Sequence, residues 1–237
     1  MIYLISYRDF KDRIFSHLND NKVRLYRGQS SVSWALNSSY LRFCNDNDIP
    51  FDINSFSQLL DSFIAEIDSY SSSEISSLSL DQKIAFAQHF GLPTPFLDWT
   101  DSPYVALFFA ICNRKLLDKS PFRIWCLSFE KNASFFQGQL NDLDSIFSVL
   151  DIQTSNITRK YRQHGYFTYS NTTLDVKSLL EKEDILAELI WYDVNGEDWL
   201  YIMRELQLMN IHHGNMFDSF EGFAKDAVIR YFYDYRK

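Results

Sequence analysis

The chain of 237 residues is poor in glycine, proline and cysteine. Seven glycines and five prolines exclude a collagen-like or low-complexity protein, because those classes depend on a high content of both residues. The three cysteines, Cys44, Cys112 and Cys126, form no even-numbered framework and no CxxC pair. We therefore expect reduced thiols that pack in the core, as is usual in the cytoplasm.

Long apolar runs are also absent. No segment reaches the roughly 18 consecutive apolar residues that a membrane-spanning helix needs. The opening residues, MIYLISYRDF, lack the apolar core and the small-residue cleavage site of a secretion signal. These features predict a cytoplasmic protein with no membrane partner.

Positive charge is in deficit. Lysine and arginine number 23 against 31 acidic residues, so the net charge is −8. We do not expect general electrostatic binding to nucleic acid, because such binding needs excess cations facing phosphate. One basic cluster, formed by Arg159, Lys160 and Arg162, is the only candidate for a local nucleic-acid surface. A solvated basic face is the competing interpretation of this cluster.

Apolar and aromatic residues are abundant, at 46% and 17% of the chain, which is enough for a full core without disulfides. Apolar residues at helical spacing, with caps at Ser6 and Ser102, predict helices at 6–18, 55–70, 81–90, 198–210, from Pro103 onward and after 219. Strand patterns are predicted at 23–29 and 122–129 and within 161–170 and 184–194. No βαβ rhythm and no linker are visible. The chain is therefore predicted to be one α+β domain over residues 1–237.

The run AFAQHFGLPTPFLDWTDSPYVALFFA, residues 85–110, places groups that need partners inside an apolar segment. These are Gln88, His89, Asp98, Trp99, Thr100 and Asp101. A segment that only packs has no use for them, since buried polar groups need hydrogen bonds. They predict a cleft beside the strand end at Arg27, with part of the set capping the helix that starts at Pro103.

Two of the candidate residues have open alternatives. Arg27, followed by Gly28, either presents its planar guanidinium to a phosphate or carboxylate, or forms a structural salt bridge to a carboxylate such as Asp98. His89, near a helix end, is either a site residue or a satisfied core or capping residue.

Several common sites are not signalled. No set of His, Cys, Asp and Glu has zinc spacing, and the adjacent His212 and His213 cannot readily ligate one ion. The chain has no GxGxxG, GxxxxGK[ST] or GxSxG motif. We expect no bound metal. A nuclease is the last-ranked function, because Asp98 and Asp101 alone supply too few carboxylates for metal ions.

Four segments, taken in order, resemble the FRG domain family. They are LYRGQ, the run of residues 85–110, RQHGYFT and LQLMNIHHGNMFDSFEGFAKD. The family is named for an aromatic-Arg-Gly motif and has the long signature Q-H-x-G-x-P-T-x-x-L-D-W-T-x-x-P-x-x-A-x-x-F-A. The resemblance covers about residues 23–226, so it implies a single FRG-type domain.

A more distant likeness links the Tyr-Arg-Gly strand end to the ADP-ribosyltransferases. It implies mixed or antiparallel sheets flanked by helices, with NAD as the substrate. Arg27 would grip the NAD phosphates, and the backbone of Gly28 would hold the nicotinamide amide. Tyr26, Phe96 or Trp99 would stack on a ring of the ligand.

The same likeness implies catalytic residues. Thr100 and Gln163 would position the ribose, His89 would organise the site, and an acceptor base would come from His89, His164 or Glu221. Gln163 or His164 stands where the family usually has a catalytic glutamate, so Glu221 is considered as its substitute. A carboxylate there stabilises the positive charge that develops as the bond from ribose to nicotinamide breaks.

The resemblances imply an NAD-dependent ADP-ribosyltransferase-like enzyme, acting as a toxin or anti-phage effector on a nucleic-acid or protein acceptor. A toxin would also have an antitoxin protein as its partner. The alternative is a non-catalytic binding module of the same fold, in which Arg27 and Asp98 belong to a buried polar network. An open pocket lined by Arg27, Thr100 and Gln163 favours the enzyme, and an Arg27 sealed by Asp98 favours the module.

Overall fold

The computed structural model describes residues 4–70, 75–152 and 165–235. The elements up to residue 111 are β1 (Leu4–Ile5), α1 (Tyr7–Ser16), η1 (His17–Asn19), β2 (Val23–Gln29), α2 (Ser39–Asp46), α3 (Ile53–Tyr70), η2 (Ile75–Ser77), α4 (Leu80–His89), β3 (Phe96–Thr100) and α5 (Pro103–Ile111). The later elements are β4 (Phe122–Phe129), β5 (Phe136–Gln137), β6 (Phe147–Leu150), β7 (Gly165–Ser170), α7 (Val176–Lys182), β8 (Ala187–Val194), α8 (Trp199–Leu208), α9 (His213–Phe217) and α10 (Phe220–Tyr235).

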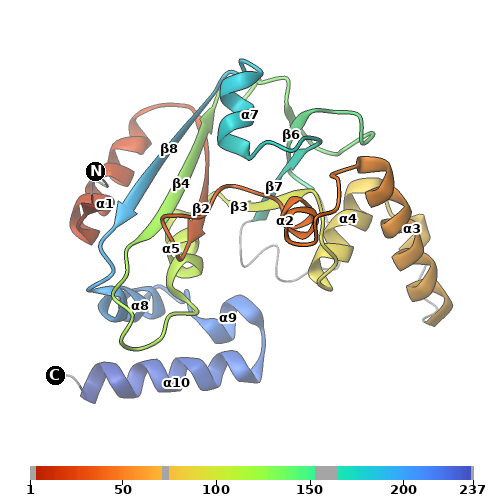
Figure 1. Cartoon of the computed structure of the whole chain (residues 1–237). Coiled ribbons are helices and arrows are strands. Elements are labelled where there is room, and N and C mark those ends of the chain that lie inside the picture. The colour runs from red at the N-terminus through yellow and green to blue at the C-terminus, as the bar shows by residue number, and fades with distance from the viewer. Residues whose placement is uncertain (1–3, 71–74, 153–164, 236–237) are drawn as a thin grey trace.

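The described strands form one mixed sheet in the order β1-β8-β4-β2-β3-β7-β6-β5. The pairs β1–β8 and β5–β6 are parallel, and the other neighbours are antiparallel. Figure 1 shows the sheet through the middle of the molecule, with α1, α8, α9 and α10 on one side of the view and α2, α3 and α4 on the other. The α+β single-domain fold predicted from the sequence is confirmed.

Local signals set several element boundaries. Ser6 caps α1 through a reciprocal bond with Asp9, and Ser102 caps α5 by accepting from the Val105 backbone N–H. Pro103 occupies the first turn of α5, where its missing N–H costs nothing. The strands predicted at 23–29 and 122–129 match β2 and β4 residue for residue.

Burial follows the alternation of side chains along the strands. On β4, Ile124 and Cys126 face the core under α1, α5 and α8, while Trp125 and Leu127 face the core under α7. A third cluster joins α2, α3 and α4 to β3 through Phe96.

The three cysteines are buried and unpaired, as the sequence predicts. Among the described residues, no helix combines the length and the hydrophobicity that crossing a bilayer requires.

Candidate functional site

A pocket opens where strands β2 and β3 separate. β2 pairs with β4 at all seven of its positions, but it pairs with β3 only at Tyr26 and Thr100. The pocket has a volume of about 180 Å³. Polar and aromatic residues on its wall include Arg27, Ser39, Arg42, Gln88, Phe96 and Asp98. Because β2 continues along β4 while β3 turns away, Arg27 reaches across the gap between the two strands.

Arg27 is the most enclosed cation of the pocket. Its Nη1 donates to the Asp98 carbonyl oxygen at 2.6 Å and lies 3.7 Å from Oδ2 of the Asp98 carboxylate. The side chain is 20% exposed, and its Nε is buried with no hydrogen-bond partner among the described residues. Burial lowers the pKa of the guanidinium, the Asp98 carboxylate opposes this shift, and the charge of Arg42 adds to it. An arginine still stays protonated near neutral pH, so the guanidinium keeps its positive charge on the pocket wall.

A chain of hydrogen bonds holds Asp98 in place. Gln88 Nε2 donates to Asp98 Oδ1 at 2.7 Å, and Thr94 Oγ1 donates to Gln88 Oε1. The Thr94 backbone N–H donates to Ser39 Oγ at 2.9 Å, which connects the network to the start of α2. Thr94 is fully buried, so these bonds satisfy groups that would otherwise be costly to bury. Part of the polar set in residues 85–110 therefore lines the pocket and positions its carboxylate.

Arg42 brings a second guanidinium to the pocket from α2. Its Nη1 donates to the Asn37 carbonyl oxygen at 2.5 Å, and the side chain is exposed. Arg27 and Arg42 face the single carboxylate of Asp98 among the lining residues. The pocket therefore carries local positive charge, although the net charge of the chain is −8. This local charge favours the binding of anionic ligands in the pocket.

Phe96 joins Arg27 among the residues that line the pocket, although it is only 1% exposed, whereas Gly28 has a packing role. A Cβ at residue 28 would lie 1.9 Å from the Ala106 carbonyl oxygen and 2.7 Å from the Ala110 nitrogen. Only glycine therefore allows α5 to approach β2 this closely.

Tyr26, another of the proposed stacking residues, lies away from the pocket wall. Its hydroxyl is 2.9 Å from His17 Nδ1, and the other ring nitrogen of His17 is 3.0 Å from the Tyr192 hydroxyl. Burial is the main cause that raises the pKa of Tyr26. Its ring, 4% exposed, packs in the core under α5.

Trp99 and Thr100 also have internal partners. Trp99 Nε1 donates to Thr168 Oγ1 at 3.0 Å, and the residue is 3% exposed. Thr100 Oγ1 accepts from the Ser102 backbone N–H at 3.1 Å, so it helps to start α5. Neither residue lines the pocket. This matches the part of the sequence interpretation in which some of the polar set caps the following helix.

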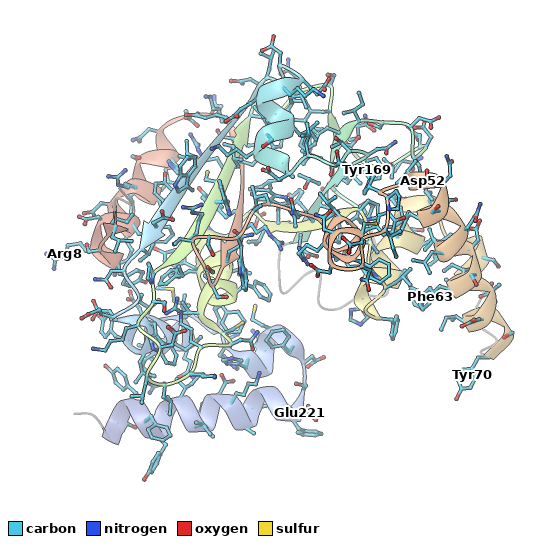
Figure 2. The ribbon with its side chains drawn as sticks, viewed as in Figure 1. Arg8, Asp52, Phe63, Tyr70, Tyr169 and Glu221 are labelled. Carbon is cyan, nitrogen blue, oxygen red and sulfur yellow. The ribbon has the colours of Figure 1, made fainter. Side chains whose placement is uncertain are left out.

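His89 and Glu221 are exposed and do not line the pocket. His89 ends α4, where its ring lies 5.0 Å from that of Phe90. Glu221 lies in the first turn of α10, where Figure 2 shows it beside α9. The other proposed site residues, Gln163 and His164, and the basic cluster at 159–162 lie outside the described residues.

Sequence reasoning missed the contribution of α2. Ser39 and Arg42 reach the pocket from this helix, which was not predicted. A signal was present, because Ser38 caps the helix and Leu41 and Cys44 recur at helical spacing. For a metal ion, no group of three or more suitable ligands occurs within residues 4–70, 75–152 and 165–235.

Comparison with known families agrees with the resemblance seen in the sequence. Residues 22–119 match the FRG domain. No curated protein and no solved structure matches the chain. The match begins one residue before β2 and ends after α5, so the two later resembling segments, RQHGYFT and LQLMNIHHGNMFDSFEGFAKD, lie beyond it. Every residue that lines the pocket falls within the matched range. The stretch that builds the candidate site therefore matches the FRG domain family over residues 22–119.

Proposed function

We propose that the Arg27 pocket binds the phosphates of NAD and that the protein transfers ADP-ribose from NAD to an acceptor. The observation that carries the proposal is the position of Arg27, whose side chain is 20% exposed on the wall of a pocket shared with Arg42. Guanidinium groups bind phosphate through several N–H donors at once. A pocket of about 180 Å³ holds part of a dinucleotide, so the rest of NAD would lie across the neighbouring surface.

The proposed reaction balances without a redox partner. The bond from ribose C1′ to the nicotinamide nitrogen breaks, and its electron pair stays on the nicotinamide. A nucleophile of the acceptor bonds to C1′ and releases its proton to a base or to water. The products are nicotinamide, the ADP-ribosylated acceptor and a proton.

Within this proposal, Asp98 supplies the negative charge that the reaction needs. It is the only carboxylate among the lining residues, and Gln88 fixes one of its oxygens. A fixed carboxylate near the ribose lowers the energy of an oxocarbenium-like transition state. This role stands beside the roles proposed for Gln163 and Glu221.

The proposed biological setting comes from the family likeness. We propose a cytoplasmic toxin or anti-phage effector that modifies a nucleic acid or a protein and, as a toxin, is held by an antitoxin protein. The three unpaired cysteines suit the cytoplasm. The net charge of −8 favours a protein acceptor over a nucleic acid.

A mass-resolved assay of NAD consumption tests the proposal. Purified protein would be incubated with NAD, with cell lysate or total RNA as the acceptor, beside the Arg27→Gln variant. Arg8→Gln is the matched control, because Arg8 is exposed on α1 and loses the same charge. We expect nicotinamide release and an added ADP-ribose mass on one acceptor class. Both signals should be lost in Arg27→Gln and kept in Arg8→Gln, with circular dichroism showing that both variants fold.

A non-catalytic binding module is the second candidate, because Tyr26, Trp99 and Thr100 are all engaged in internal hydrogen bonds. On this alternative, Arg27 binds an anionic ligand that is not turned over. NAD or pyrophosphate binding that depends on Arg27, without nicotinamide release, would favour the module. Absence of any anion binding would exclude both candidates.

A further inference from the structure

Helix α10 has a buried inner face and, opposite it, an exposed apolar face. Its inner face carries Gly222, Asp226 and Ile229, spaced at i, i+4 and i+7. A Cβ at residue 222 would lie 2.6 Å from the His213 carbonyl oxygen. Ile229 is 7% exposed and belongs to the core under α1, α5 and α8. Asp226 is fully buried and accepts from the His213 backbone N–H at 3.0 Å. These contacts fix which side of α10 faces the molecule.

The outer face of α10 has an apolar seam. Phe220, Ala224, Ala227 and Tyr231 recur at i, i+4, i+7 and i+11, and all four are exposed. Phe220 is 91% exposed and Tyr231 is 64% exposed. Figure 1 shows α10 along the lower side of the molecule, with α8 and α9 above it. This spacing is the one by which helices pair through a continuous seam.

Two further apolar residues flank the seam. Phe223, 52% exposed, lies on one flank together with Arg230, and Val228, 50% exposed, lies on the other together with Glu221. The ring of Phe223 packs against Gly214 of α9, because a Cβ at residue 214 would lie 2.4 Å from the ring. A contiguous apolar face of this kind on a polar surface marks an interaction site.

The order of side-chain sizes along the seam points to its occupant. From Phe220 to Tyr231, the seam reads large, small, small, large, and it reads the same in reverse. A two-fold symmetric interface requires such self-complementarity, because each copy presents the same patch to the other. In an antiparallel pair, Phe220 meets Tyr231 of the second copy, and Ala224 meets Ala227. The alanines at the centre let the helix axes approach to about 8 Å, the close end of helix packing.

We infer that two copies of this chain associate through an antiparallel pairing of their α10 helices. In this arrangement each flank lies against the same flank of the second copy. Arg230 then faces an aromatic ring, Phe223, and Glu221 faces Val228, so no like charges oppose one another among these four flanking residues. The two helix dipoles also run in opposite directions, which is favourable.

The seam is small for a dimer interface. With about 150–250 Å² for a full aromatic side chain, the exposed seam and flanks offer roughly 400–500 Å² of apolar surface per copy. A standard stable interface uses about 800 Å² per partner. An interface well below the standard size predicts a weak dimer, and we expect a Kd on the order of 10–100 µM.

Sedimentation velocity on the full chain tests the inference over about 1 to 300 µM, which brackets the expected Kd. Wild type should shift from monomer to dimer across this range. Ala227→Glu should stay monomeric with a Kd raised at least about tenfold, because it places two carboxylates at the centre of the seam. Ala65→Glu, on the exposed side of α3, is the matched control and should dimerise like wild type. A wild type that stays monomeric, or an Ala227→Glu variant that still dimerises, would overturn the inference.

Cysteine crosslinking tests the direction of pairing. The three native cysteines are buried, so a new thiol on α10 is the reactive one. An equimolar mixture of Ala224→Cys and Ala227→Cys should form intermolecular disulfides faster than either variant alone. Faster crosslinking of Ala224→Cys alone would overturn the antiparallel arrangement. Circular dichroism would verify that both variants fold.

Discussion

At the scale of single residues, Arg27 and Asp98 define the character of the pocket. The guanidinium is partly satisfied by the Asp98 backbone carbonyl, while the carboxylate of the same residue lies 3.7 Å away and is 63% exposed. The carboxylate of Asp98 therefore lies near the Arg27 guanidinium but does not shield it from the pocket. This arrangement leaves room for a ligand anion that competes with Asp98 for the same cation.

Replacing Asp98 by asparagine should strengthen anion binding. The change removes a negative charge near the bound phosphate but keeps an oxygen that can accept from Gln88. We expect the affinity for pyrophosphate to rise about three- to tenfold, the scale of one charge interaction near 4 Å in a solvated pocket. Isothermal titration calorimetry measures this. Asp46→Asn on the exposed side of α2 is the charge-matched control. Unchanged or weaker binding in Asp98→Asn would contradict the prediction.

Replacing Gly28 by alanine should destabilise the fold. The added methyl group meets the Ala106 carbonyl oxygen at 1.9 Å, which the backbone of α5 cannot relieve without moving. We expect a loss of about 3 kcal/mol or more in the free energy of unfolding, measured with urea. Gly138→Ala is the control, because nothing lies within 4 Å of its added Cβ. Equal stability of the two variants would show that Gly28 is not a packing residue.

At the scale of elements, Asp226 connects α10 to α9. Its carboxylate accepts from the backbone N–H groups of His213 and Gly214 and from the rings of His212 and His213. His213 Nε2 in turn lies 2.7 Å from the Cys112 carbonyl oxygen, which can only accept. One buried carboxylate thus ties α9 and α10 to each other, and His213 ties both to the end of α5.

The pKa of Asp226 gives this connection a pH dependence. Burial raises the pKa of the carboxyl, but the hydrogen bonds from Gly214, His212 and His213 outweigh burial, so the pKa lies below its usual value. A carboxyl whose pKa is lower in the folded state stabilises the fold at pH values above its unfolded-state pKa, which is about 3.9. That contribution is lost as the pH falls through the folded-state pKa.

Asp226→Asn should therefore destabilise the protein at neutral pH by about 2–4 kcal/mol, the usual cost of removing a buried, hydrogen-bonded charge. The difference from wild type should shrink as the pH falls below about 4, because the wild-type carboxyl is then protonated in the unfolded state and must lose that proton when the protein folds. Urea unfolding at neutral and acid pH measures both effects. Asp12→Asn, exposed on α1, is the control. A difference that stays constant with pH would contradict this account.

At the scale of the whole molecule, self-association through α10 should appear in thermal stability. Association stabilises the folded state by mass action, so the unfolding temperature rises with protein concentration. For a chain of this length we expect an increase of about 2–4 °C when the concentration exceeds the Kd about tenfold. Ala227→Glu should show a flat dependence in the same calorimetric series. A flat wild-type series would contradict the prediction.

The sequence by itself determined the features that depend on neighbours within a few residues. Helix starts at Ser6 and Ser102, strands β2 and β4, and the buried cysteines follow from caps, proline geometry and local apolar patterns. The FRG resemblance also depends only on the order of residues, and the family match covers residues 22–119. Helix α2 was not predicted, although Ser38 marks its start.

Only the tertiary structure decided which candidate residues meet. Arg27 and Asp98 are 71 residues apart, and they come together because β2 and β3 separate after one pair. Trp99 is adjacent to Asp98 in the chain yet points to the other side of β3 and bonds Thr168, because successive side chains of a strand face opposite ways. The local pattern also left open which face of α10 packs inward. Long-range packing selects the inner face, because the His213 carbonyl lies so close to Gly222 that a larger residue would not fit there.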